Sequence, residues 1–292
     1  MASDRFYSDP IVPQRRLLQE VYFLQSFHSL HPGVTSQIFA QTRIGRGKSS
    51  YELLVDTLPD DGAPLKVVDL GCGDGFLLEL LGKRHSKKLH LIGIDMSEAE
   101  LHAARIRLAS FEVTLLCEKA HNVSLSDSSV DYVLSHMSFM LMNPIVNVIQ
   151  ELTRVLKLGG VFTAVVPGSL QPGDAYELFV QALRWAFDRD GLELKTRLGD
   201  PRTQSVDGIR SLFGENPSFS SPIIEDYVLK LDATPQKLCE VFFFNYNVAL
   251  LSPESQEKLR SELMEKFQSA RSEEGLTPCS MGLRQFTAKR RA

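Results

Sequence analysis

The sequence predicts an α/β protein whose core is a doubly wound, mostly parallel sheet with helices on both faces. Two short β-branched runs, at about 66–70 and 89–94, are separated by a leucine-rich segment with helical spacing. The first run ends in three glycines at alternate positions, Gly71, Gly73 and Gly75, directly before that segment. A strand, a glycine turn and a helix in this order are typical of a doubly wound sheet. The 292 residues are enough for one large domain with a cap.

The first part of the chain, 1–62, precedes the first strand and is predicted to form a helical N-terminal lid. Apolar residues recur at helical spacing from Gln14 to Phe27, and His31-Pro32-Gly33 interrupts the pattern. A second helix is expected from about Ser49 to Thr57, because proline and glycine follow it.

The segment 63–168 alternates strands with helices and is expected to be the core of the domain. Apolar residues from Val146 to Leu156 share one helix face, and Gly159-Gly160 after them indicate the end of that helix. Strands are predicted at about 66–70, 89–94, 113–116, 131–135 and 161–166.

The last part, 169–292, is expected to complete the sheet and to carry helical caps. Two insertions, about 169–218 and 234–272, exceed a minimal core, and the first contains a predicted helix from Asp174 to Phe187. Ligands of such a sheet bind outside the carboxyl ends of its strands. We therefore expect the N-terminal helices and at least one insertion to cover the site. The remaining strands are predicted at about 223–231 and 279–288.

The composition argues against nucleic-acid and membrane partners. The net charge is −4, and the basic run Lys289–Arg291 is small, whereas nonspecific nucleic-acid binding needs a basic face. No apolar stretch approaches the roughly 18 residues of a membrane span, and the start has no signal-peptide core. The four cysteines show no metal-ligand spacing. We expect a cytoplasmic protein with reduced thiols, no metal and a small-molecule partner.

The glycine turn and Asp95 together indicate a site for a nucleotide-like cofactor. Glycine lets the backbone approach a ligand that a Cβ would block. Asp95 ends the next predicted strand, where a carboxylate can accept hydrogen bonds from both ribose hydroxyls. A dinucleotide is disfavoured, because Phe76 stands where its third glycine is needed. Two carboxylates in the turn, Asp69 and Asp74, would repel a pyrophosphate but attract an ammonium or sulfonium group.

This combination resembles the class I, Rossmann-like family of S-adenosylmethionine-dependent methyltransferases that act on small molecules. The first motif of that family looks like Asp69–Gly75, with Asp95 as its ribose acid. Asp127–Val133 is similar to the acidic turn before its fourth strand, and Glu151–Gly160 to the helix and turn before its fifth. The resemblance implies a seven-stranded sheet with an antiparallel last strand, and S-adenosyl-L-methionine as the cofactor.

The resemblance also implies which residues contact the cofactor. The glycine turn would face its methionine part, Asp95 the ribose and Met96 the adenine, with Ser135 at the end of the fourth strand. The contacts implied in the turn are Asp69, Gly71, Cys72, Gly73, Asp74 and Gly75.

One position departs from the family. After the third strand the family has an acid followed by alanine, but this chain has Lys119-Ala120, and lysine cannot accept a hydrogen bond from the adenine amine. Either the backbone of Ala120 alone reads the adenine, or Glu118 or His121 substitutes. Lys119 itself either contacts the cofactor or is a solvated surface residue.

The reactive end of the site has one candidate base and one candidate cation. His136 is the candidate general base, because the ordinary pKa of histidine lies near neutral pH. The alternative is a polar wall residue, since many methyl transfers need no base. Arg43 or Arg46 could pair with the cofactor carboxylate, and Arg46 is our candidate. The alternative for both is an exposed basic loop.

The acceptor pocket is the part that the sequence describes least well. Tyr22 and His28 on the first helix and Tyr246 in the second insertion are candidate substrate contacts. The aromatic stretch Cys239–Tyr246 could line an apolar pocket, although such clusters more often form the core of their own cap.

The sequence thus predicts S-adenosylmethionine-dependent methyl transfer to a small organic acceptor, at oxygen, nitrogen or carbon. The resemblance makes specialised metabolism a natural setting. One alternative keeps the reaction but takes protein or RNA as the acceptor. Another is a cofactor-binding partner protein without catalysis. The acceptor, the methylated atom, the oligomeric state and the pathway stay open.

Overall fold

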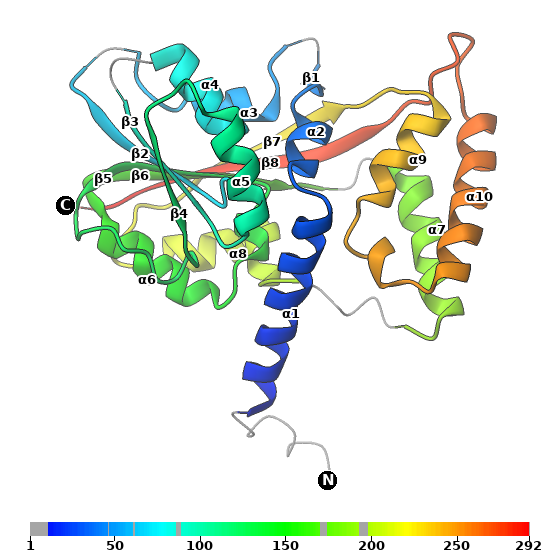
Figure 1. Ribbon diagram of the computed structural model, residues 1–292, viewed down its shortest axis with the longest axis horizontal. Coiled ribbons are helices and arrows are strands. Elements are labelled where there is room, and N and C mark those ends of the chain that lie inside the picture. The colour runs from blue at the N-terminus through cyan, green and yellow to red at the C-terminus, as the bar shows by residue number, and fades with distance from the viewer. Residues whose placement is uncertain are drawn as a thin grey trace.

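The computed structural model describes residues 11–45, 47–60, 62–85, 89–169, 174–192 and 198–291. A single twisted sheet forms the centre, with helices on both faces and the helices α7, α9 and α10 grouped beside it (Figure 1). The strands follow the order β1-β7-β8-β6-β5-β2-β3-β4 across the sheet. Their bounds are β1 Arg43–Ile44, β2 Leu65–Leu70, β3 Leu89–Asp95, β4 Val113–Cys117, β5 Val130–His136, β6 Leu156–Pro167, β7 Ile223–Lys230 and β8 Ser280–Lys289.

The strand pairing confirms the predicted fold class. The five strands β4, β3, β2, β5 and β6 are parallel neighbours, and β8 and β7 continue the sheet antiparallel. The helices are α1 Ile11–Leu30, α2 Val34–Phe39, α3 Ser50–Val55, α4 Phe76–His85, α5 Glu98–Arg107, α6 Ile145–Val155, α7 Ala175–Arg189, α8 Val206–Ile209, α9 Pro235–Phe243 and α10 Pro253–Ser269. Short 3₁₀ turns occur at Phe139–Leu141, Pro201–Gln204 and Val248–Leu250, and a π turn at Arg210–Gly214.

The sheet has eight strands rather than the seven that the resemblance implied. The additional strand, β1, pairs antiparallel with β7 through Arg43 opposite Lys230 and Ile44 opposite Leu229. An edge strand such as β7 offers unpaired backbone groups, and a neighbouring segment can satisfy them. Two residues are too few to produce a recognisable strand pattern, so β1 could not be predicted from the sequence.

The boundary between α6 and β6 also differs from the prediction. The helix ends at Val155, and β6 begins at the next residue, five residues before the predicted start. The glycines Gly159 and Gly160 therefore lie within the strand and do not cap the helix. The register between β5 and β6 shifts here, and Gly159 has φ +78°. A Cβ on Gly160 would lie 2.9 Å from the Lys157 carbonyl oxygen and 3.2 Å from the Asp131 carbonyl oxygen of the neighbouring strand, which explains the glycine.

Alternation along the strands divides the core into two layers. Val68 on β2 packs with Phe162 of β6 against α6 on one face, whereas Val67 points to the other face, toward α3 and α4. The first layer contains the ring cluster Phe139, Phe162, Phe213, Phe219 and Phe286. The second layer is rich in leucine from α4 and α5. Packing in both layers fixes the ends of the strands, so the loops at the carboxyl edge of the sheet begin at fixed positions.

A third apolar cluster holds the helical cap together. Phe179 of α7 and Phe242 of α9 are stacked with ring centroids 4.5 Å apart, and Phe267 of α10 packs against Phe242. Buried residues of α7, α9 and α10 form this cluster apart from the two layers of the sheet. Most of the aromatic stretch in α9 therefore serves the core of its own cap. None of the helices in the described part of the chain is long and apolar enough to cross a membrane.

Candidate active site

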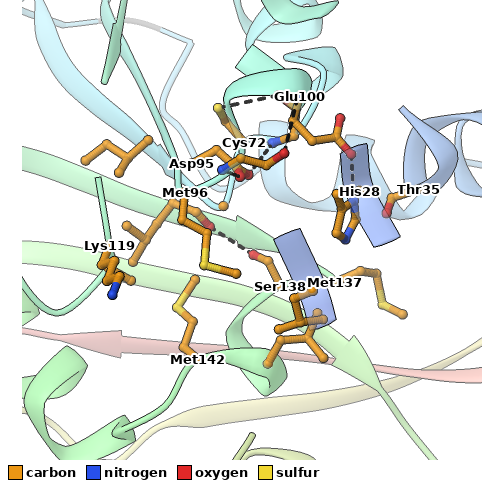
Figure 2. A pocket seen from close by; sticks show the side chains of 18 of the residues that line it. His28, Thr35, Cys72, Asp95, Met96, Glu100, Lys119, Met137, Ser138 and Met142 are labelled. Atoms are coloured by element: carbon orange, nitrogen blue, oxygen red, sulfur yellow. Dashed lines mark hydrogen bonds and ion pairs between the residues drawn. The ribbon is translucent and has the colours of Figure 1, made fainter. Parts of the chain in front are cut away.

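The loops at the carboxyl ends of β2, β3, β4 and β5 surround one cavity, which α1 and a cap residue close from above. Val21, Leu24 and His28 of α1 line the cavity together with Tyr246, which follows α9. These three residues of α1 lie on one helix face because they are spaced by three and four positions. Figure 2 shows His28, Asp95 and Glu100 on one side, with Met137 and Met142 among the side chains around the same space.

Each of the three glycines in the turn is present for a different structural reason. A Cβ on Gly71 would collide with the Ser138 side chain, and one on Gly75 would lie 2.7 Å from Leu108, which directly follows α5, and 3.2 Å from Ala104 of α5. Gly73 has φ +51°, and its nearest neighbour for a Cβ would be the Glu100 carboxylate at 3.7 Å. Gly73 therefore leaves backbone exposed to the cavity. Gly75 is needed for helix packing and does not line the cavity.

Asp95 is fixed in place and still has acceptor capacity. Its Oδ2 accepts a hydrogen bond from Gly73 N at 2.9 Å, and its Oδ1 accepts one from Ser97 N at 2.9 Å. A carboxylate offers about four lone-pair positions, so both oxygens can each accept another hydrogen bond. Burial raises the pKa of Asp95, and the two backbone N–H groups lower it. The arrangement suits two adjacent hydroxyl donors.

Asp69 is a buried carboxyl group without a donor. Its side chain lines the cavity and is 2% exposed, and within the described residues Oδ1 has no hydrogen-bond partner. Burial raises the pKa of Asp69, and the charges of Asp95 and Asp74 raise it further. An unsatisfied buried acceptor costs stability, so the site favours a cationic donor. The ammonium group of S-adenosylmethionine has this chemistry, and Asp69 therefore fits that cofactor.

Asp74 lines the same cavity but already has partners. Arg107 donates to Asp74 Oδ2 at 2.5 Å in an ion pair, and Ser36 Oγ donates to the same atom at 2.6 Å. These contacts tie the turn to α5 and α2. Of the two acids, Asp74 thus has donors from the protein, whereas Asp69 Oδ1 has none among the described residues.

A polar network joins α1, α5 and the cap at the edge of the cavity. His28 Nδ1 lies 2.7 Å from Glu100 Oε1, and His28 Nε2 lies 2.9 Å from the Tyr246 hydroxyl. Gly33 N donates to the other Glu100 oxygen at 2.8 Å. A carboxylate can only accept, so Nδ1 carries the proton and, in the neutral imidazole, Nε2 accepts from Tyr246. The candidates His28 and Tyr246 therefore meet at the site.

The sequence did not single out Glu100. Ser97 and Glu100 have the spacing of a capping box at the start of α5. Ser97 does accept from Glu100 N, but the Glu100 carboxylate reaches across to His28 instead of back to the cap. A buried glutamate with partners from distant segments is a tertiary feature, and local spacing gives no signal for it.

The loop after β4 forms the opposite wall. Lys119, Ala120 and His121 of this loop line the cavity, together with Glu118, whose carboxylate accepts from Ser124 N at 2.8 Å. Met96, which follows β3, also lines the cavity. Burial and the Lys119 charge lower the pKa of His121. Lys119 thus lines the cavity, and every alternative that the sequence left open for adenine recognition lies on this wall.

His136 lines the cavity, but its environment makes it a weak base. Its Nε2 lies 2.9 Å from Ser50 Oγ, its ring stacks on Tyr51 with centroids 3.6 Å apart, and Nδ1 has no partner within the described part of the chain. Burial lowers the pKa of His136 to about 3. Its role as general base stays a prediction and loses the pKa argument that motivated it.

Three of the predicted site residues that the structure describes are not brought to the cavity, and a fourth lies outside the described residues. Ser135 is fully buried and donates to the Leu70 carbonyl at 3.0 Å, whereas Ser138 lines the cavity in its place. Tyr22 is 67% exposed and points away from the face of α1 that lines the cavity. Gly75, as described above, packs on α5. Arg46 lies outside the described residues.

The neighbouring candidate Arg43 does not line the cavity either. Its guanidinium donates to the carbonyls of Ala40 and Thr42, both at 2.9 Å. The segment before the first parallel strand contributes Tyr51 instead, a residue that sequence reasoning missed. Another missed residue is Met137, whose backbone adopts φ +51° at the end of β5. A non-glycine residue in this conformation is uncommon and clusters at functional sites.

Comparison with known proteins identifies the central part of the chain. Residues 67–160 match the family model of the methyltransferase domain. A carboxy-S-adenosyl-L-methionine synthase from Trichodesmium erythraeum is 33% identical over 109 residues, which cover 36% of this chain and 40% of the relative. A malonyl-[acyl-carrier protein] O-methyltransferase from Coxiella burnetii is 34% identical over 110 residues, covering 37% and 36%. The similarity thus spans about two fifths of these relatives.

The fold has close counterparts among solved structures. The YcgJ protein from Bacillus subtilis superposes with a TM-score of 0.55 at 16% identity, over 83% of this chain and 98% of that protein. The sheet order, the glycine turn and the acid at the end of β3 define a class I, Rossmann-like cofactor-binding domain. The family match assigns residues 67–160 to the methyltransferase domain, a class of domain that uses S-adenosyl-L-methionine as its cofactor.

Proposed function

We propose that this protein transfers a methyl group from S-adenosylmethionine to a small organic acceptor held under α1 and the cap. The observation that carries the proposal is the pairing of two acids in one cavity. Asp95 has free acceptor positions for a ribose, and the buried Asp69 lacks a donor. A cofactor that carries both a ribose and an ammonium group satisfies both residues.

The residues divide the cavity into zones for the parts of the cofactor. Asp69 and the exposed backbone at Gly73 would hold the amino-acid end, and Asp95 would hold the ribose. Met96 and the wall at Lys119–His121 would enclose the adenine. When bound, S-adenosylmethionine supplies an activated methyl group. The protein contributes orientation and exclusion of water, because displacement at a sulfonium needs no further covalent chemistry from the chain.

The remaining wall suits a small acceptor with apolar surface. Val21 and Leu24 of α1 line the same cavity as Leu141 and Met142 in the segment after β5. Asn143 donates to Glu20 at 3.2 Å and so joins this segment to α1. Methionine and leucine side chains adapt to ligand shape and exclude water. The placement of α1 and Tyr246 over the cavity supports an enclosed acceptor more than a protein or RNA segment, which needs an open groove.

A second candidate is a protein that uses the same cofactor without methyl transfer. One relative is named a carboxy-S-adenosyl-L-methionine synthase, so similarity in this domain does not by itself fix methyl transfer. The family has an acid at the position of Lys119. This departure is the residue-level reason for considering the alternative.

Isothermal titration with S-adenosylmethionine and S-adenosylhomocysteine tests the cofactor assignment. We expect micromolar binding by the wild type and at least a tenfold loss in Asp95→Asn, about 1.4 kcal/mol. The matched control is Asp188→Asn, since Asp188 is exposed on α7 and should leave the affinity unchanged. Absence of binding by folded wild-type protein would refute the proposal.

A transfer assay then separates the two candidates. Wild-type protein is incubated with S-adenosylmethionine labelled in its methyl group and a panel of small acceptors. Label in an acceptor, lost in Asp95→Asn, supports methyl transfer. Tight cofactor binding without label transfer across the panel would favour the second candidate.

A further inference from the structure

Tyr51 is a cavity residue whose ring is fixed on two sides. It lies on α3, is 5% exposed and lines the cavity. Its ring stacks on the His136 imidazole with an interplanar angle of 20°, and its other neighbour is the edge of Phe76, 4.8 Å between centroids. The ring therefore has little freedom to move, and its hydroxyl is presented in one direction.

The hydroxyl of Tyr51 has no hydrogen-bond partner within the described residues. The hydroxyl is not among the fully buried unpartnered atoms of the described residues, so it is accessible from the cavity that Tyr51 lines and can donate to a ligand there. Burial raises the pKa of Tyr51, and the charges of Asp74 and Asp69 raise it further. The phenol therefore stays protonated near neutral pH. It can donate a hydrogen bond, but it cannot act as a base.

The amino-acid end of S-adenosylmethionine presents two opposite charges. Asp69 can accept from the ammonium group, but the carboxylate needs donors. Among the described residues that line the cavity, Lys119 carries the one lysine or arginine charge, and it follows β4, two strands away from β2 in the sheet. Tyr51 packs on Phe76, the first residue of α4 after the glycine turn, and lines the same cavity as Asp69 near the end of β2. A neutral donor is thus available where a carboxylate would sit.

We propose that the Tyr51 hydroxyl donates a hydrogen bond to the carboxylate of the bound cofactor, beside the ammonium site at Asp69. The proposal rests on the proposed function. It makes His136 a positioning residue, because its neutral ring supports the Tyr51 ring from behind and Ser50 holds it in turn. It also gives α3 a functional role. The capping box of Ser49 and Glu52 fixes the start of this helix directly before Tyr51.

The test compares two ligands that differ in one group. S-adenosylmethionine carries the carboxylate, and decarboxylated S-adenosylmethionine lacks it but keeps the ammonium, the sulfonium and the adenosine. By isothermal titration we expect Tyr51→Phe to weaken binding of the first ligand about tenfold or more, as expected for loss of a hydrogen bond to a charged group. Binding of the second ligand should change by no more than about twofold.

Controls separate this role from a structural one. Tyr132→Phe is the matched variant, because Tyr132 lies on β5 away from the cavity and should bind both ligands as the wild type does. Equal losses for both ligands in Tyr51→Phe would mean that the ring only packs, and no loss would mean that the hydroxyl has no role. Either result overturns the proposal.

Two further outcomes are also decisive. If Arg46→Ala removes the preference of the protein for the carboxylate and Tyr51→Phe retains it, the carboxylate is held by that cation and the proposal is wrong. If wild-type protein binds neither ligand, the proposed function itself fails. Should Tyr51→Phe fold poorly, the wild type alone remains informative, since equal affinity for the two ligands would exclude any carboxylate contact.

Discussion

At the scale of single residues, the buried acids around the cavity differ in whether the protein supplies their donors. Glu100 receives hydrogen bonds from Gly33 and His28, and Asp74 is paired with Arg107. Asp69 has no such partner on Oδ1 in the described chain. The fold keeps this uncompensated acceptor although it costs stability. A ligand that donates a hydrogen bond to Asp69 would compensate for this cost.

His136 shows the opposite case, a basic group kept neutral by burial. Its pKa is about 3 in the folded protein, against 6.5 in an ordinary peptide. The unfolded chain therefore binds more protons below pH 6.5, and the unfolding free energy falls as the pH drops from 6.5 toward 3. Denaturant unfolding at pH 7.5 and 4.5 should show that His136→Phe loses about 2 to 3 kcal/mol less than the wild type between these values.

The comparison within one pair of proteins cancels other groups that titrate in this range. Equal losses in wild type and variant would show that the histidine keeps an ordinary pKa. In that case it would regain its standing as a candidate general base near neutral pH.

At the scale of secondary-structure elements, His28 connects α1 to two other parts of the molecule. His28 binds Glu100 of α5 on one side and Tyr246 of the cap on the other. These contacts connect the first helix to segments 72 and 218 residues away in the sequence. Periodicity predicted the helix itself, but its docking depends on partners that no local pattern specifies.

Replacing His28 should therefore loosen α1 without unfolding the domain. We expect His28→Ala to weaken binding of S-adenosylhomocysteine by about 1 to 2 kcal/mol, because Glu100 loses a donor and the cap loses a contact. Hydrogen exchange over residues 19–30 should accelerate at the same time. Tyr22→Ala is the control on the same helix, since its side chain faces solvent. Similar changes in both variants would contradict a specific role for His28.

At the scale of the whole molecule, the residues that stabilise the sheet are separate from the residues that line the cavity. The ring cluster under α6 packs Phe162 against Phe139 and Phe213, with centroids 5.1 and 5.6 Å apart. The cavity lies at the carboxyl edge, where the chain is irregular and the turns need positive φ. The cap adds a separate apolar cluster that can carry Tyr246 to the site without disturbing the sheet.

The ring cluster should accordingly dominate stability. Phe162 is fully buried, and Phe162→Ala should lower the unfolding free energy by about 3 to 5 kcal/mol in denaturant titrations. Trp185→Ala is the control, because this large side chain is 69% exposed on α7 and should change stability by less than about 0.5 kcal/mol. A loss below about 1 kcal/mol for Phe162→Ala would mean that the cluster can repack around the gap.

The sequence alone determined the fold class and the central parallel strands, and it singled out Asp69, Gly73 and Asp95, which line the cavity and which we propose hold the cofactor. These features are local, because a β-branched run, a turn that needs glycine and an acid at a strand end are each written within a few consecutive residues. The two-residue strand β1 and the boundary between α6 and β6 were missed, since pairing with distant strands decided them.

Only the tertiary structure decided which side chains meet in the cavity. It brought Tyr51 and Glu100 to the site and turned Tyr22 to solvent, and it replaced Ser135 by Ser138 as a wall residue. It also buried His136 deeply enough to lower its pKa. The physical reason is common to all of these residues. Burial, charge and hydrogen-bond partners arise from segments that are far apart in the chain, whereas the sequence pattern records only what neighbouring residues require.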